Sequence, residues 1–163
     1  RRAPDSLAGA IIIASTALPF AGDAEERRRD VTLLRERGAG AVIARKWPDY
    51  VAPHHAARAD IRLCVEDMAQ ATPLDDFAAQ TEMAITRCDS RAVVRETRVP
   101  LLLIHGGLDR MLPATAFPAF PGAARVRERM VPDSGHFVPL EAPQPAAAAI
   151  AEFLRECVPC CSQ

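Results

Sequence analysis

Residues 99–109 read Val-Pro-Leu-Leu-Leu-Ile-His-Gly-Gly-Leu-Asp, and this stretch decides the fold. A continuous apolar run of this length, closed by two glycines, is typical of a strand buried on both faces of a parallel sheet. Asp109 then stands in the loop at the carboxyl end of that strand. Because active sites of open α/β sheets collect at this edge, Asp109 is a candidate functional residue.

Two further strands are predicted, one on each side of this stretch in the sequence. Residues 7–15 contain three consecutive isoleucines and indicate a short strand buried on both faces. Residues 124–131 alternate arginines with other side chains, which suits a charged edge strand. Right-handed crossovers, the second through residues 113–120, favour parallel pairing with the middle strand in the centre. The expected order is 10–15, 101–106 and 125–131, with the outer edge of the first strand unpaired.

Residues 22–97 lie between the first two strands and are predicted to be helical. Asp23 is suited to cap a helix that ends at Gly38, and Thr72 is suited to cap a later one. Another helix is expected to carry an apolar stripe formed by Ala57, Ile61, Cys64, Val65 and Met68.

The remaining elements complete an α/β pattern. A short helix is predicted near residues 90–96. An amphipathic helix, whose apolar positions run from Ala146 to Cys157 and which Pro159 stops, is predicted to close the fold. The fold class expected from this order is α/β, with a three-stranded, mainly parallel sheet and a helical insertion after the first strand.

Composition narrows the classes of function. The chain has 163 residues, a net charge of −1 and 49% apolar residues, which is typical of a soluble globular protein. The absence of a basic excess argues against a nucleic-acid partner. No apolar run approaches the roughly 18–20 residues of a membrane span, so no membrane partner is expected. The chain opens on Arg1-Arg2 without an initiator Met or a secretion signal, and we interpret it as a fragment.

The cysteines favour a reducing compartment. Their number is five, so they cannot all pair with one another. Cys157, Cys160 and Cys161 cluster near the end of the chain, but no further His or Cys pair completes the four ligands of a zinc site. We therefore expect free thiols, a cytoplasmic location and no bound metal.

A second candidate residue follows the third predicted strand. His136 lies in the sequence Ser134-Gly135-His136, and loops at the ends of neighbouring parallel strands come together. A carboxylate that orients an imidazole and stabilises the imidazolium is part of a nucleophilic triad. The residues alone leave a second interpretation open, a turn aspartate and a solvated loop histidine. Arg110 could also draw Asp109 away, and Asp133 could pair with His136.

Together these stretches resemble the C-terminal half of the α/β-hydrolase fold. The acid strand of that family reads V-P, an apolar run and G-x-x-D, and its catalytic His sits in a G-H pair after the last strand. The resemblance implies a hydrolase core over residues 1–21 and 98–163 and a helical cap over 22–97. It implies that Asp109 orients His136, that His136 is the general base, and that no cofactor is needed. Small-molecule esters or lactones are the implied substrates.

The nucleophile of that family is absent from this sequence. Its elbow requires glycines two residues before and after the serine, and no serine, cysteine or aspartate here has both. The resemblance implies that the nucleophile lies upstream of Arg1. We therefore expect an esterase-like or lactonase-like fragment that is inactive in isolation. The alternative is a non-catalytic α/β module that associates, with itself or another subunit, through its exposed strand edge.

Other candidate residues have simpler interpretations. His105-Gly106-Gly107 matches the oxyanion motif of some lipases, but no nucleophile elbow follows it, so His105 is interpreted as a strand-end residue. His54 and His55 are interpreted as a solvated pair at a helix start. Aromatic residues of the insertion fit either a substrate pocket or packing against the core: Trp47, Tyr50 and Phe77.

Overall fold

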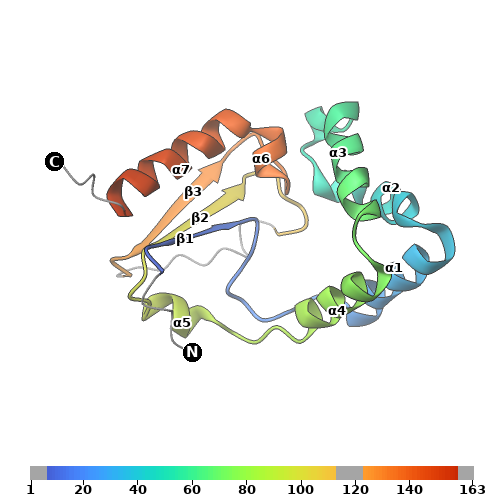
Figure 1. Ribbon diagram of the computed structural model, residues 1–163, viewed down its shortest axis with the longest axis horizontal. Coiled ribbons are helices and arrows are strands. Elements are labelled where there is room, and N and C mark those ends of the chain that lie inside the picture. The colour runs from blue at the N-terminus through green and yellow to red at the C-terminus, as the bar shows by residue number, and fades with distance from the viewer. Residues whose placement is uncertain (1–6, 113–122, 158–163) are drawn as a thin grey trace.

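The computed structural model describes residues 7–112 and 123–157, and its centre is a parallel sheet. The strands are β1 (Ala10–Ile13), β2 (Leu101–Gly106) and β3 (Val126–Val131), in the order β1-β2-β3 (Figure 1). Both pairings are parallel, which confirms the predicted order with β2 in the centre. The predicted crossover at 113–120 and the cysteines at 160 and 161 lie outside the described residues.

One face of the sheet carries the main apolar core. Helix α7 (Pro143–Cys157) packs on this face, directly after the four-residue helix α6 (Val138–Glu141) (Figure 1). Proline suits the first turn of α7, where its missing N–H has no helical acceptor to lose. The buried core joins residues from β2, β3, α6 and α7: Leu102, Ile104, Val131, Val138, Ala146, Ala149 and Phe153.

The two outer strands differ from each other in burial. β1 was predicted to be buried on both faces, but its residues are only half-buried because it is the edge of the described sheet. β3 is an edge strand, as its charges indicated. Its arginines pair with glutamates of α7: Arg127 with Glu156 and Arg129 with Glu152.

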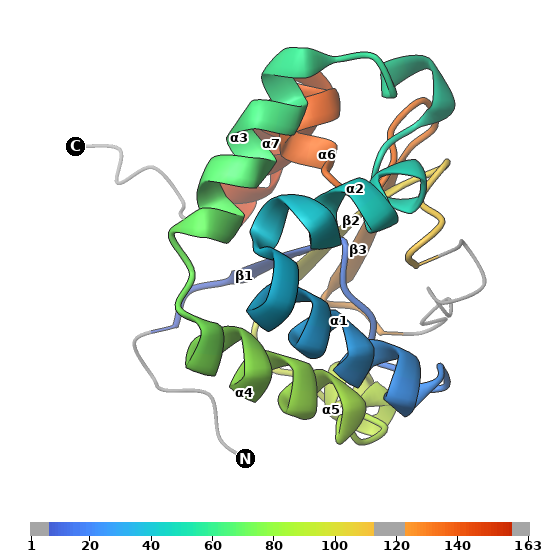
Figure 2. The same cartoon turned by 90° about the vertical axis from the view of Figure 1, so that its right-hand side faces the viewer.

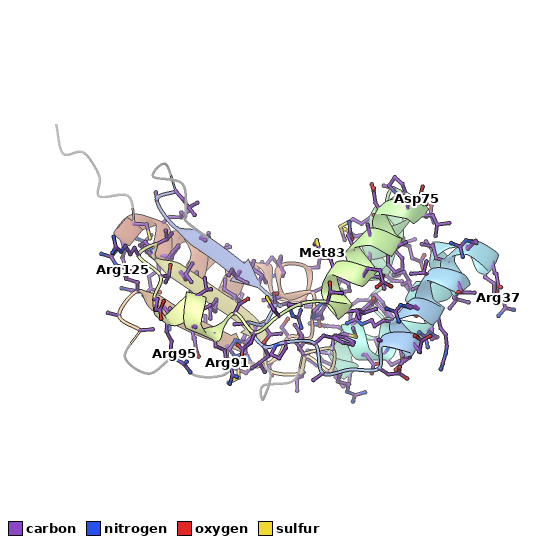
Figure 3. The ribbon with its side chains drawn as sticks, turned by 90° about the horizontal axis from the view of Figure 1, so that it is seen from below. Arg37, Asp75, Met83, Arg91, Arg95 and Arg125 are labelled. Atoms are coloured by element: carbon purple, nitrogen blue, oxygen red, sulfur yellow. The ribbon has the colours of Figure 1, made fainter. Side chains whose placement is uncertain are left out.

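Helices α1 to α5 form an insertion between β1 and β2. Helices α1 to α4 lie beyond the carboxyl ends of the strands, whereas α5 lies near the start of β2 (Figures 1 and 2). Viewed from below, the sheet with α7 and α5 forms one end of the molecule, and the helices from α1 to α4 form the other (Figure 3). The elements are α1 (Ala24–Arg37), α2 (Ala39–Tyr50), the 3₁₀ turn η1 (Pro53–His55), α3 (Ala59–Gln70), α4 (Leu74–Ile85) and α5 (Arg91–Arg95). No helix among the described residues is long and apolar enough to cross a membrane. The division into core and cap at residues 22 and 97 stays a prediction.

The helix-capping predictions were half right. Asp23 caps α1, since its Oδ1 accepts hydrogen bonds from the amides of Glu25 and Glu26, and Gly38 ends the helix with a φ of 79°. Thr72 does not cap α4. Its hydroxyl instead donates to the carbonyl of Met68 in the preceding helix, which leaves α4 without a side-chain cap.

The apolar stripe predicted for α3 was partly wrong. Ile61 and Val65 are buried against α2, in a cluster with Ile43, Trp47 and Val51. The stripe continues to Ala69, so it follows every fourth residue. Cys64 and Met68 lie to one side of that line and are exposed.

A buried carboxylate joins the first two helices of the insertion. Asp30 of α1 is 4% exposed and lies between Arg45 and Lys46 of α2. The Lys46 ammonium also contacts Oε1 of Glu26 at 3.0 Å, and this contact holds the pKa of Glu26 below its ordinary value. Because a buried carboxylate is costly without such partners, the cluster fixes α1 against α2.

We expect Asp30→Asn to lower the free energy of unfolding by about 1–3 kcal/mol, because the amide removes the charge that Arg45 and Lys46 contact. Urea unfolding followed by circular dichroism measures the change. Asp67→Asn is the matched control, since Asp67 is exposed on α3, and it should change stability by less than about 0.5 kcal/mol. Equal stabilities of the two variants would contradict the structural role of Asp30.

Candidate active site

Asp109 and His136 meet at the carboxyl edge of the sheet. They follow β2 and β3, whose last paired residues are Gly106 and Val131. Oδ2 of Asp109 lies 2.8 Å from Nδ1 of His136, so the predicted proximity of the two side chains is confirmed. The competing pair is not formed, because Asp133 is exposed and the partner of His136 is Asp109.

The Asp109 carboxylate is fixed on both of its oxygens. Its side chain is fully buried, whereas that of His136 is 24% exposed. Oδ1 accepts a hydrogen bond of 2.8 Å from the amide of Leu112, and Oδ2 faces the imidazole. The contact with the buried carboxylate contradicts the alternative of a solvated loop histidine, because the His136 side chain is largely buried and has Asp109 as its partner.

Glycines allow the two loops to approach each other at backbone distance. A Cβ on Gly106 would lie 2.1 Å from the carbonyl oxygen of Gly135 and 2.3 Å from that of Ser134. A Cβ on Gly107 would lie 2.7 Å from the carbonyl oxygen of Pro132. The amide of Leu108 donates to the Ser134 carbonyl at 2.9 Å. The two glycines at the end of β2 and just after it therefore let the loop of His136 lie directly on the loop of Asp109.

The insertion supplies a platform for the His136 ring. Tyr50, the last residue of α2, stacks on this ring with 6.1 Å between centroids and 17° between planes, and its carbonyl accepts the His136 amide at 2.8 Å. Burial raises the pKa of Tyr50, so its phenol is neutral at neutral pH. Of the three insertion aromatics singled out in the sequence, Tyr50 reaches the pair. Trp47 packs within the insertion, where its indole donates to the carbonyl of Ala56.

This arrangement determines which ring nitrogen of His136 can act as a base. An ionised carboxylate only accepts hydrogen bonds, so the pairing with Asp109 places the proton on Nδ1. Nε2 then keeps its lone pair and can accept a proton from a reacting group. The prediction that Nε2 faces the position of a nucleophile stays a prediction.

The other histidines of the chain differ in their burial and in their partners. His105 is buried within β2, where burial lowers its pKa and keeps the ring neutral. The interpretation of His54 and His55 as a solvated pair was wrong for His55. Nδ1 of His55 lies 3.1 Å from Oε2 of Glu141, and both side chains are largely buried.

Glu141 is the residue that the sequence analysis missed. It is 6% exposed and contacts both the insertion and the loop of His136. Its sequence signal is a single charge within residues 137–142, which otherwise read Phe, Val, Pro, Leu and Ala. A lone carboxylate in such a segment is either exposed or bound by several donors, and here it is bound.

A cleft of about 250 Å³ lies between the loop that follows Asp109 and the start of the insertion, and neither Asp109 nor His136 lines it. Its lining includes Leu112, whose amide binds Asp109, together with Leu18, Phe20 and Arg87. The guanidinium of Arg87 donates to the Leu18 carbonyl at 2.9 Å, so it shapes one wall. Within residues 7–112 and 123–157, no group of three or more His, Cys, Asp or Glu side chains is placed to hold a metal ion.

Comparisons with known proteins identify the fold. No family model matches the sequence, and no curated protein sequence matches it. Solved structures do match: a thermophilic esterase from Thermogutta terrifontis is 25% identical, with a TM-score of 0.79 over 94% of this chain and 57% of its own.

Two further structures agree with this match. The enol-lactonase from Burkholderia xenovorans LB400 is 18% identical, with a TM-score of 0.67 over 90% of this chain and 56% of its own. MGS-M2, an α/β-hydrolase enzyme from a Medee basin deep-sea metagenome library, is 16% identical, with a TM-score of 0.68 over 88% of this chain and 55% of its own. The chain therefore has part of the α/β-hydrolase fold and spans just over half the length of these proteins.

We expect Gly106→Ala to lower the free energy of unfolding by about 3 kcal/mol or more, because the new methyl group collides with the backbone of Ser134 and Gly135. Gly40→Ala is the control. Gly40 has nothing within 4 Å of its Cβ position and lies in α2, so this change should raise stability by about 0.4–1 kcal/mol. Urea unfolding measures both, and a neutral Gly106→Ala would contradict the close approach of the loops.

Proposed function

We propose that this chain supplies the acid–base pair of an α/β-hydrolase active site of esterase or lactonase type. The observation that carries the proposal is the 2.8 Å contact between Oδ2 of Asp109 and Nδ1 of His136, at the ends of two adjacent parallel strands. The fold shared with an esterase and an enol-lactonase supports it. Small-molecule esters or lactones are the proposed substrates.

His136 moves protons in the proposed reaction. Nε2 accepts the proton of the nucleophile hydroxyl as its oxygen attacks the carbonyl carbon, and donates this proton to the leaving alcohol oxygen. In the second half, Nε2 takes a proton from water as the water oxygen attacks the acyl carbon. The bond between this carbon and the nucleophile oxygen then breaks, the acid product leaves, and Nε2 returns its proton to the nucleophile oxygen. Asp109 stays ionised and stabilises each imidazolium, while the amide of Leu112 fixes its other oxygen.

The nucleophile is proposed to come from residues outside this sequence. No serine of the chain has the flanking glycines that a nucleophile elbow requires. Ser134, the serine next to the site in sequence, is fully buried, and its hydroxyl donates to the carbonyl of Gly135. The compartment we propose is the cytoplasm, which rests on the odd number of cysteines.

A chimera tests this proposal. The segment of the Thermogutta terrifontis esterase that matches this chain is replaced by the chain, and hydrolysis of p-nitrophenyl acetate is measured. We expect His136→Gln to reduce the rate of the chimera by about 10³-fold or more, because the general base is lost. His54→Gln is the control, since His54 is exposed in η1 and should leave the rate unchanged. A folded chimera that is inactive, or indifferent to His136→Gln, would contradict the proposal.

The isolated chain should give no burst of p-nitrophenol. An Asp–His pair without a nucleophile and oxyanion donors forms no acyl-enzyme, so release should be slow and linear. Stopped-flow absorbance with p-nitrophenyl acetate measures this directly. A burst that is stoichiometric with the chain would reveal a nucleophile within it.

One observation favours a second candidate function, association through the edge of β1. The amides of Ala10 and Ala14 donate to carbonyls in and next to β2, so by the alternation of a strand those of Ile11 and Ile13 face the other edge. Among the described residues no strand covers that edge. An uncovered row of amides is a template for pairing with another chain.

If the chain self-associates in this way, Ile13→Pro should convert oligomers to monomers, because proline removes an outward-facing donor. Analytical ultracentrifugation of the purified chain gives the oligomeric state. Ile12→Pro is the comparison, since it removes a donor that faces β2 and should destabilise the sheet instead. A chain that is monomeric before any substitution would exclude self-association through this edge.

A further inference from the structure

Glu141 is a buried carboxylate with four donors around it. Its Oε1 accepts a hydrogen bond of 3.1 Å from the amide of Phe137. Its Oε2 accepts from the amides of Gly135 at 3.0 Å and Ala52 at 2.8 Å, and lies 3.1 Å from Nδ1 of His55. A carboxylate in so little water is costly unless it is fully hydrogen-bonded, and these donors satisfy it.

The donors flank His136 on both sides in sequence. Gly135 precedes it and Phe137 follows it, and both amides point to the same carboxylate. The amide of His136 itself donates to the carbonyl of Tyr50. The main chain at three consecutive residues is therefore held, independently of the bond between the His136 ring and Asp109.

The other donors belong to the helical insertion. Ala52 and His55 lie 89 and 86 residues from Glu141 in the sequence. The two parts approach closely, since a Cβ on Gly135 would lie 2.6 Å from the amide nitrogen of Ala52. Glu141 thus occupies the junction between the insertion and the loop of His136.

We infer that Glu141 is a positioning residue for His136: its carboxylate anchors the amides of Gly135 and Phe137 and joins them to Ala52 and His55 of the insertion. The inference rests on the proposed function, in which His136 is the general base. Asp109 selects the tautomer of the ring, and Glu141 keeps the ring where Asp109 can do so. Loss of the Glu141 carboxylate releases the His136 ring from Asp109, although neither Asp109 nor His136 is itself substituted.

The test reads the ring nitrogens of His136 in the full chain. The protein has four histidines, so ¹⁵N-histidine labelling gives a small set of signals. Spectra are recorded about 2 pH units above the ordinary histidine pKa of about 6.5, where an unpaired neutral ring exchanges between its two tautomers. In the unsubstituted chain, His136 should show the tautomer with the proton on Nδ1.

We expect Glu141→Gln to replace that tautomer by an average of both. The glutamine amide has the shape of the carboxylate, but one of its two acceptor oxygens is replaced by NH₂. This NH₂ group faces at least one N–H group that donates to Glu141 in the unsubstituted chain, so that hydrogen bond is lost. Glu152→Gln is the matched control, because Glu152 lies on α7 and pairs with Arg129 of β3. It should leave the His136 signals unchanged.

Asp109→Asn separates this inference from the proposed function. If Asp109→Asn changes the tautomer of His136 and a folded Glu141→Gln does not, the positioning role is overturned and the pair stands. If neither substitution changes it, the pair itself fails and the proposed function with it. If both change it and Glu152→Gln does not, the inference is supported.

If Glu141→Gln does not fold, hydrogen exchange in variants of His55 tests the positioning role of Glu141 instead. His55→Leu removes one of the four donors, whereas His55→Asn keeps an N–H near the position of Nδ1. We expect His55→Leu to speed hydrogen exchange of the Gly135 and Phe137 amides about tenfold, and His55→Asn to restore most of the protection. Unchanged exchange in His55→Leu would overturn the link between the insertion and this loop.

Discussion

The parallel pairing of β2 with β3 is the constraint on which the candidate site depends. Residues 27 positions apart in the sequence come within hydrogen-bonding distance because both strands end at the same edge of the sheet. The close contact of Gly106 with the backbone of Gly135 converts this general property into a fixed distance. With a larger residue at that position, the strands could still pair, but the loops could not lie on each other.

The insertion is as much a part of the site as the sheet. Its ion pairs around Asp30 fix α1 against α2, and α2 ends at Tyr50, which stacks on the His136 ring. The next turn carries Ala52 and His55 to the carboxylate of Glu141. A disturbance within these helices therefore reaches the imidazole through packed side chains and backbone hydrogen bonds, over a short path.

The sequence was sufficient to predict the parallel sheet and the proximity of Asp109 and His136. It was insufficient to predict the contacts that hold the loop of His136 in place. The apolar run before Gly106 predicts a buried strand, and parallel topology then brings Asp109 and His136 together without knowledge of any contact. The links of Tyr50, Ala52 and Gly135 to the site use main-chain carbonyls and amides, which every residue has and which leave no mark in a sequence. His55 and Glu141 were misread or missed because each is satisfied by a partner more than 80 residues away.

The sequence separation of these contacts also bears on the order of folding. β2, β3 and α7 lie within residues 101–157, so their contacts close comparatively short loops. The bonds of Glu141 to Ala52 and His55 close loops of 89 and 86 residues and carry a greater entropic cost. Local contacts form before such distant ones, so β2, β3 and α7 assemble first, and the insertion docks onto them later. The surroundings of His136 are completed in that last step, and a chain arrested before it would hold Asp109 and His136 side by side without the stacked tyrosine.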